Sequence, residues 1–172
     1  MITESPLNNS ALKNFKARLE AWLIPPLLFV MIERPAYWRS LDELLSALET
    51  SADKLHESLS KAKGSDKDKA TLRHVIGMER WGQRRLRVAL GEENPNDEHH
   101  AYKPDANSTW EELLQAFQSA RQETLDLGYS LAAKEVDLNQ GIAHNQFGDM
   151  SVKAWLRYLH LHAWAEARHI KG

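Results

Sequence analysis

Two histidines and a glutamate near the C-terminus could act together on a ligand. His162, Glu166 and His169 follow one another at intervals of four and three residues, which places them in one column on a helix that turns about 100° per residue. The apolar residues Trp155 and Leu159 fall in the same arc, so we expect the column to point into the protein. A buried carboxylate is strongly destabilising unless it is paired, hydrogen-bonded or bound to a cation. The column therefore predicts a partner inside the fold.

His74 is the partner that the sequence offers. It lies beside Met78 and Trp81 on a partly apolar face of a predicted helix, away from the arginines of that helix. One imidazole from this helix, with His162 and Glu166 from another, would give three neutral or anionic ligands, enough for an open divalent metal site. A histidine on an apolar arc, taken on its own, is most often a core residue that hydrogen-bonds a neighbour, so both interpretations stay open.

Other polar residues could assist such a site. Glu79 and Gln83 lie within the apolar stripe of the His74 helix, and a buried polar side chain needs a partner. Glu79 could substitute for a ligand or hydrogen-bond one, and His169 could do the same from the last helix. Arg85, on the His74 side of its helix, could receive an anionic group of a substrate, or could pack against the protein or face solvent.

Three further histidines lie in predicted loops. His99 and His100 are adjacent, and adjacent residues of an extended chain do not converge on one metal ion, so the pattern favours solvated loop residues. His144 precedes the last predicted helix and could reach the open end of the site, although the pattern favours a capping role in the loop.

Five helical segments are predicted to position these residues. Capping boxes beginning at Ser40 and Ser108 open the second and fourth segments. We expect one all-α domain over residues 1–172, in which four long helices form a bundle and residues 1–35 are a helical extension packed on it. The predicted helices cover residues 10–24, 41–62, 67–90, 108–134 and 151–170, and the two long loops cover residues 92–107 and 139–148.

Composition favours helices and excludes several classes of protein. Leu and Ala far outnumber the β-branched residues, a balance typical of helical proteins. The absence of cysteine excludes disulfides, thiolate metal sites and cysteine nucleophiles. A net charge of −2 argues against nucleic acid as the main partner. The longest apolar run, residues 21–32, is broken by two prolines and is shorter than the ~20 residues that span a bilayer. With no secretory signal visible, we expect no membrane partner and a cytoplasmic protein.

Two stretches of the sequence resemble the DinB/YfiT-like family of helical proteins. Residues 72–81 (LRHVIGMERW) resemble the histidine-bearing second core helix of that family, and residues 147–159 (FGDMSVKAWLRYL) resemble the entry and body of its last helix. The resemblance spans residues 40–172. Outside the two motifs, only the layout of the helices and loops is similar. It implies an up-and-down four-helix bundle with unusual connections, often a homodimer, that holds nickel or zinc on three histidines.

The resemblance also assigns site residues and a substrate class. It places the first ligand at His74 and the second at His162, while the third position holds Glu166 in place of the usual histidine. The related mycothiol-dependent isomerases are similar in using a mixed His and Glu set, although there the Glu precedes the His. His169 stands where the family usually has Gln. Relatives of this kind act on low-molecular-weight thiols such as bacillithiol or mycothiol, and the metal would lower the pKa of the thiol.

Two functions of different classes follow as expectations. The first is a divalent-metal-dependent transferase or hydrolase that acts on a small molecule, with a thiol or water at an open position of the ion. The second is a non-catalytic helical protein in which His162, Glu166 and His169 form a buried hydrogen-bond network and whose role is dimerisation or partner binding.

Overall fold

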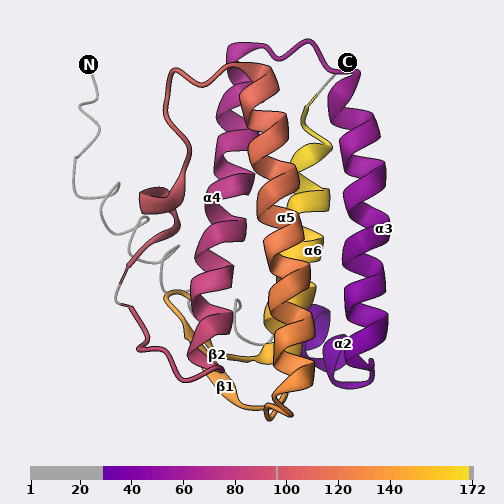
Figure 1. Ribbon diagram of the computed structural model, residues 1–172, viewed down its shortest axis with the longest axis vertical. Helices are drawn as coiled ribbons and strands as arrows, with labels where there is room; N and C mark the ends of the chain where they lie inside the picture. Colours follow the sequence, from indigo (N-terminus) through magenta and orange to yellow (C-terminus); the bar gives the residue numbers. More distant parts are fainter. Residues whose placement is uncertain (1–28, 96, 171–172) are drawn as a thin grey trace, which may run out of the picture.

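Long helices dominate the computed structural model, which describes residues 29–95 and 97–170. The prediction of a mostly helical chain is confirmed, with a small sheet that the sequence did not indicate. None of the described helices is both long enough and apolar enough to cross a membrane. The described elements are η1 (Phe29–Glu33), α2 (Arg34–Tyr37), α3 (Leu41–Ser60), α4 (Asp66–Val88), η2 (His99–Tyr102), α5 (Trp110–Ala133), β1 (Gly141–His144), β2 (Gly148–Ser151) and α6 (Val152–Ala167) (Figure 1).

Capping side chains set where the long helices begin. In the predicted box of α3, the backbone N–H of Ser40 donates to Glu43 at 2.7 Å, and that of Glu43 donates to Ser40 Oγ at 3.1 Å. The box of α5 lies one residue later than expected, because Thr109 caps the helix and Glu112 closes the box. The predicted helix over residues 10–24 lies outside the described residues.

The connection between α4 and α5 sets the direction of α5. Residues 97–109 run back along α4, where the side chains of Arg80 and Arg73 donate to the carbonyl oxygens of Tyr102 and Pro104. As a result, α5 starts beside the N-terminal end of α4 and points the same way (Figure 1). Helices α3 and α4 each pack against both α5 and α6. The parallel pair α4 and α5 departs from the expected up-and-down order, because this long connection returns the chain to the end of α4 where that helix began.

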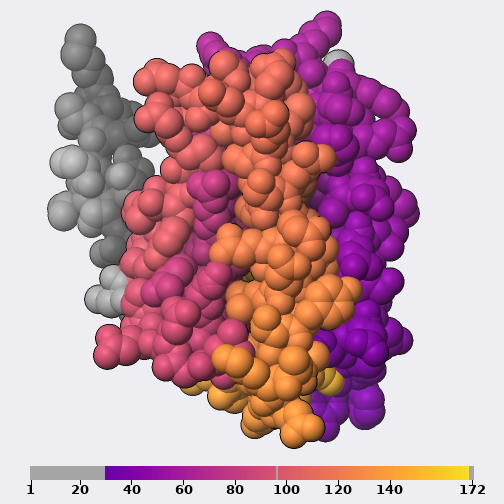
Figure 2. All heavy atoms as spheres, in the orientation of Figure 1, coloured from indigo at the N-terminus to yellow at the C-terminus, as the bar shows by residue number. Residues whose placement is uncertain are grey.

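Helices α4 and α6 approach closely at Gly82. A Cβ atom added to this glycine would meet the side chain of Leu159 at 2.5 Å, so the absence of a side chain permits the contact. Trp81 and Trp155 pack beside it, with ring centres 5.3 Å apart and both side chains fully buried. Figure 2 shows α3, α4 and α5 standing in front of α6, little of which is visible from this side.

Strands β1 and β2 form a hairpin where a loop was predicted over residues 139–148. The strands are antiparallel, with Ile142 opposite Met150. The turn between them ends at Gly148, whose φ of 78° is a conformation that glycine favours. The indole N–H of Trp155 donates to the carbonyl of Ile142 at 3.1 Å, which fixes the hairpin against α6. The loop prediction is wrong here because strands of four residues carry too little alternation to be recognised.

Glu79 and Gln83 find their partners in α5. Arg121 Nη2 lies 3.1 Å from Glu79 Oε2, and both side chains are almost fully buried. Thr124 Oγ1 donates to Glu79 Oε1 at 2.6 Å, and Gln83 Nε2 donates to the carbonyl of Ala120 at 2.6 Å. The carboxylate of Glu79 is therefore engaged by α5 and does not assist a metal ligand as the sequence had suggested.

Substitution Glu79→Gln should destabilise the protein strongly, because it leaves the Arg121 guanidinium buried without its countercharge. The expected loss in free energy of unfolding is about 3–5 kcal/mol, measured by urea denaturation at pH 7. The matched control is Glu123→Gln, which breaks the more exposed ion pair of Glu123 with Arg87 and should cost less than about 1 kcal/mol. Equal losses in the two variants would show that the buried pair does not stabilise the fold in this way.

Candidate metal centre

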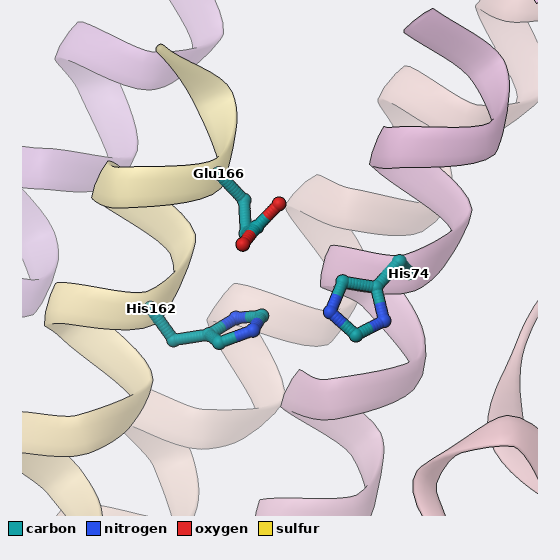
Figure 3. Close-up of side chains that lie close together, drawn as sticks. All are labelled: His74, His162 and Glu166. Atoms are coloured by element: carbon teal, nitrogen blue, oxygen red, sulfur yellow. The ribbon is translucent and has the colours of Figure 1, made fainter. Parts of the chain in front are cut away.

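Three side chains from two helices converge between α4 and α6. His74 comes from α4, and His162 and Glu166 come from α6 one helical turn apart. Figure 3 shows the two imidazoles and the carboxylate directed toward a common space between the ribbons. Each residue offers one ligand atom such that all three atoms lie within 4.8 Å of one another, and all three residues are half-buried. These are the residues that the sequence nominated, and the group could hold a metal ion.

The two imidazole rings have the spacing that a shared ion would require. The ring centres of His74 and His162 lie 5.0 Å apart, with 64° between the ring planes. Two imidazoles that bind one tetrahedral ion through metal–nitrogen bonds of about 2.0–2.1 Å also hold their ring centres about 5 Å apart. The site is therefore already close to the geometry that binding needs.

The groups of this site have no hydrogen-bond or ion-pair partner in the part of the chain that the structure describes. Neither the ring nitrogens of His74 and His162 nor the carboxylate of Glu166 makes such a contact there. Partial burial takes away some of the water around a carboxylate, which a cation or a hydrogen-bond donor can replace. A cation between the three side chains would supply what the protein itself does not, so these residues fit a divalent metal.

Burial keeps both imidazoles neutral. Desolvation, followed by the nearby histidines His74 and His99, lowers the pKa of His162 to about 4. Desolvation, followed by the charge of Lys103, also lowers the pKa of His74, while Glu166 opposes this shift. Neutral imidazole is the form that binds metals, so both rings are ready to coordinate an ion at neutral pH.

Tyr158 lies one turn before His162 on α6 and was not among the residues that the sequence indicated for the site. Its ring centre is 5.7 Å from that of His162 and 5.4 Å from that of His144. Burial, and then the charge of Glu166, raise the pKa of Tyr158 well above its usual value, so the phenol stays protonated. Its position four residues before His162 was the signal that could have identified it as a neighbour of the site.

His99 is the second residue that the sequence analysis misplaced. The interpretation of His99 and His100 as solvated loop residues holds for His100, which is exposed, but not for His99. The His99 ring is half-buried and lies 5.1 Å from the ring of His74. The assumption of an extended chain was wrong, because residues 99–102 form a 3-10 turn that places consecutive side chains close together. Glu98, His99 and His100 form a second group whose ligand atoms lie within 4.8 Å of one another.

His169 does not join the column with His162 and Glu166. Helix α6 ends at Ala167, so the helical spacing that placed His169 on the inner face no longer applies, and its side chain is exposed. No hydrogen bond joins these three side chains among the described residues. The alternative of a buried network formed by the three residues therefore gains no observation in its favour.

Arg85 is buried at a distance from the candidate site. It lies eleven residues along α4 from His74, about 16 Å at 1.5 Å per residue. Its guanidinium donates to the carbonyl oxygens of Pro95 and Asp97 at 2.6 and 3.1 Å and to Asn145 Oδ1 at 3.0 Å. Of the two roles left open by the sequence, the structure therefore favours packing, because these bonds tie the long connection and the hairpin to α4.

His144 is a core residue. Its ring stacks on Phe147 with centres 4.2 Å apart and also contacts Trp81 and Trp155. Burial, and then the charge of Arg85, lower its pKa to about 4. Its Nδ1 accepts a hydrogen bond from the backbone N–H of Gln146 at 3.2 Å, which agrees with the capping role that the sequence favoured.

A large groove lies on the other side of α6. It runs between α3 and α6 and is lined on α6 by His160, Trp164 and Arg168. These residues face away from His162 on the helix, so this groove does not lead to the candidate metal centre. Metal coordination depends on the geometry of the donor atoms, which converge between α4 and α6 and not in this groove.

Comparison with known protein families, with curated proteins and with solved structures finds no match for this chain.

The stability of the protein should fall as the pH falls from about 6.5 to 4. In this window the unfolded chain binds protons at histidines with ordinary pKa values near 6.5, whereas His144 and His162 in the folded protein, with pKa values of about 4, do not. Where the unfolded state binds more protons than the folded state, a decrease in pH lowers the free energy of unfolding. The free energy of unfolding, measured by urea denaturation across this window, reports the effect.

Substitution His144→Phe separates the contribution of His144 to this pH dependence from that of His162. The phenyl ring can keep the stacking on Phe147 but does not titrate, so the slope of stability against pH should become shallower than in the wild type. The control His100→Gln changes an exposed histidine and should leave the slope unchanged. Identical slopes for His144→Phe and the wild type would contradict the assignment of the pH dependence to this buried imidazole.

Proposed function

We propose that this chain is a DinB-like four-helix bundle that binds one divalent metal ion through His74, His162 and Glu166 and acts on a small molecule at that ion. The observation that carries the proposal is the convergence of these three side chains from α4 and α6, with ligand atoms within 4.8 Å of one another. The absence of other partners for them among the described residues supports it. The resemblance of residues 72–81 and 147–159 to the family motifs adds the expectation of the bundle.

Two imidazoles and one carboxylate suit zinc or nickel. Imidazole nitrogen binds both ions, and two His with one Glu is a ligand set found in catalytic zinc sites, which leave a coordination position open. Such an ion supplies Lewis acidity and lowers the pKa of a thiol or water that binds it. The neighbouring Tyr158, which burial keeps protonated, could donate a hydrogen bond to an anionic oxygen or sulfur of the substrate.

The substrate class and assembly follow from the family resemblance. We expect a low-molecular-weight thiol or water as the nucleophile, and a transferase or hydrolase reaction. A homodimer and a cytoplasmic location also stay predictions from the sequence. Nucleic acid is not an expected partner, given the net charge of −2. A membrane is not an expected partner either, because the longest apolar run is broken by two prolines and is too short to span a bilayer.

The protein purified without a histidine tag should contain about one zinc or nickel ion per chain, because His74, His162 and Glu166 form one open metal site. Substitutions His74→Ala and His162→Ala should abolish this content, measured by inductively coupled plasma mass spectrometry. Glu166→Gln should weaken binding by at least about tenfold, since removal of groups that merely orient metal ligands already costs 10–100-fold. The matched control is His169→Ala, which should keep the metal because its exposed side chain lies outside the group. A wild type without metal after growth with both ions would refute the proposal.

The metal-loaded protein should consume a low-molecular-weight thiol in the presence of an electrophile faster than the metal-free protein. Bacillithiol and mycothiol are the probes, and loss of free thiol is the measurement. A hydrolysis assay with activated esters forms the second arm. His162→Ala should abolish whichever rate is found, and equal rates with and without metal would contradict a reaction at the ion.

A further inference from the structure

We infer that His99, carried by η2 in the connection between α4 and α5, is an additional ligand of the same metal ion. The inference rests on the proposed metal site and names a fourth protein donor for it. No sequence motif pointed to this residue, since it lies 25 positions beyond His74 and outside every predicted helix.

The ring geometry around His74 carries the inference. His74 has two imidazole neighbours at nearly equal ring distances, His162 at 5.0 Å and His99 at 5.1 Å, with interplanar angles of 64° and 80°. Both distances match the separation of about 5 Å expected for imidazoles on one tetrahedral ion. His99 is not part of the group whose ligand atoms all lie within 4.8 Å, so its ring must turn inward to bind.

A carboxylate lies on the Nδ1 side of the His99 ring, beyond hydrogen-bond distance. His99 Nδ1 lies 4.0 Å from Glu98 Oε2, and Asn145 Nδ2 holds the other oxygen of that carboxylate at 2.7 Å. A histidine that binds a metal through one ring nitrogen usually directs the other nitrogen at a carboxylate or carbonyl oxygen. With Nδ1 on the side of Glu98, Nε2 is the nitrogen left for the ion.

A glycine in α4 allows η2 to lie close to His74. A Cβ atom added to Gly77 would meet the side chain of Lys103 at 2.7 Å and the carbonyl oxygen of His99 at 2.9 Å. Gly77 lies three residues after His74, about one helical turn. The η2 turn therefore rests directly on the part of α4 that carries the first ligand, and any larger residue at position 77 would push it away.

Residues on both sides of His99 anchor the turn. Asp97 accepts hydrogen bonds from the indole N–H of Trp81 at 3.1 Å and, through its carbonyl oxygen, from Arg85 at 3.1 Å. The hydroxyl of Tyr102 donates to the same carboxylate of Asp97. Because these contacts fix the backbone before and after His99, little more than its side-chain torsions needs to change when it binds an ion.

A separate ion held by Glu98, His99 and His100 is the competing arrangement. The rings of His99 and His100 are 5.2 Å apart, so ring distance alone does not exclude it. His100 is exposed, however, whereas His74 and His99 are both half-buried. The observations favour one ion that His99 shares with His74.

Zinc titration of the untagged full-length chain tests the inference, with a chromophoric chelator as competitor. Substitution His99→Gln should weaken zinc binding by at least about tenfold, by analogy with the 10–100-fold cost of losing supporting groups, and should alter the visible absorption spectrum of the cobalt-loaded protein. The matched control His100→Gln should leave affinity, spectrum and stoichiometry unchanged. Gly77→Ala, which keeps every ligand, should weaken binding in the same direction by displacing η2.

Three outcomes would overturn the inference, and each is distinguishable. Wild-type zinc affinity and cobalt spectrum in His99→Gln, with binding still lost in His162→Ala, would remove His99 from the site and leave the proposed function intact. Two ions per wild-type chain, one of which both His99→Gln and His100→Gln lose, would establish the separate site instead. A wild type that binds no zinc or cobalt would refute the proposed function and this inference together.

Discussion

The close approach of α4 and α6 is the constraint on which the candidate site depends. Gly82 lets Leu159 pack directly against the backbone of α4, and the two buried tryptophans, Trp81 and Trp155, fill the space beside this contact. Because the helices are antiparallel and rise by about 1.5 Å per residue, this crossing sets the register further along. His74, eight residues back on α4, therefore faces the C-terminal part of α6, which carries His162 and Glu166.

The interior polar groups of the protein are of two kinds, those with protein partners and those without. Glu79 is enclosed by Arg121 and Thr124 of α5, which supply it with a countercharge and a hydrogen-bond donor within the fold. His74 and Glu166 lie at the interface between α4 and α6. Among the described residues, their side chains make no comparable hydrogen bonds or ion pairs. Groups that are fully partnered stabilise a structure, whereas convergent groups left free are typical of binding sites. This contrast, rather than burial alone, separates the candidate metal centre from the structural ion pair.

Local sequence pattern predicted what depends on a single helix. The capping residues located the starts of α3 and α5 to within a residue, and the four-residue spacing of His162 and Glu166 placed both on the inner face of α6. The same reasoning was wrong for His169, because periodicity says nothing about where a helix ends, and α6 stops at Ala167. The sequence therefore identified the candidate ligands whose positions are fixed by helical geometry.

Features that depend on contacts between distant segments could not be predicted in this way. The proximity of His99 to His74 arises because residues 97–109 fold back along α4, which no local periodicity records. The burial of Arg85 depends on the same connection, through its bond to Asp97. A measurement that locates the ion itself would test the account most directly: anomalous X-ray diffraction from crystals of the zinc-loaded protein, collected at the zinc absorption edge. The account predicts a peak within bonding distance of His74, His162 and Glu166, and a map with no peak between these three side chains would contradict it.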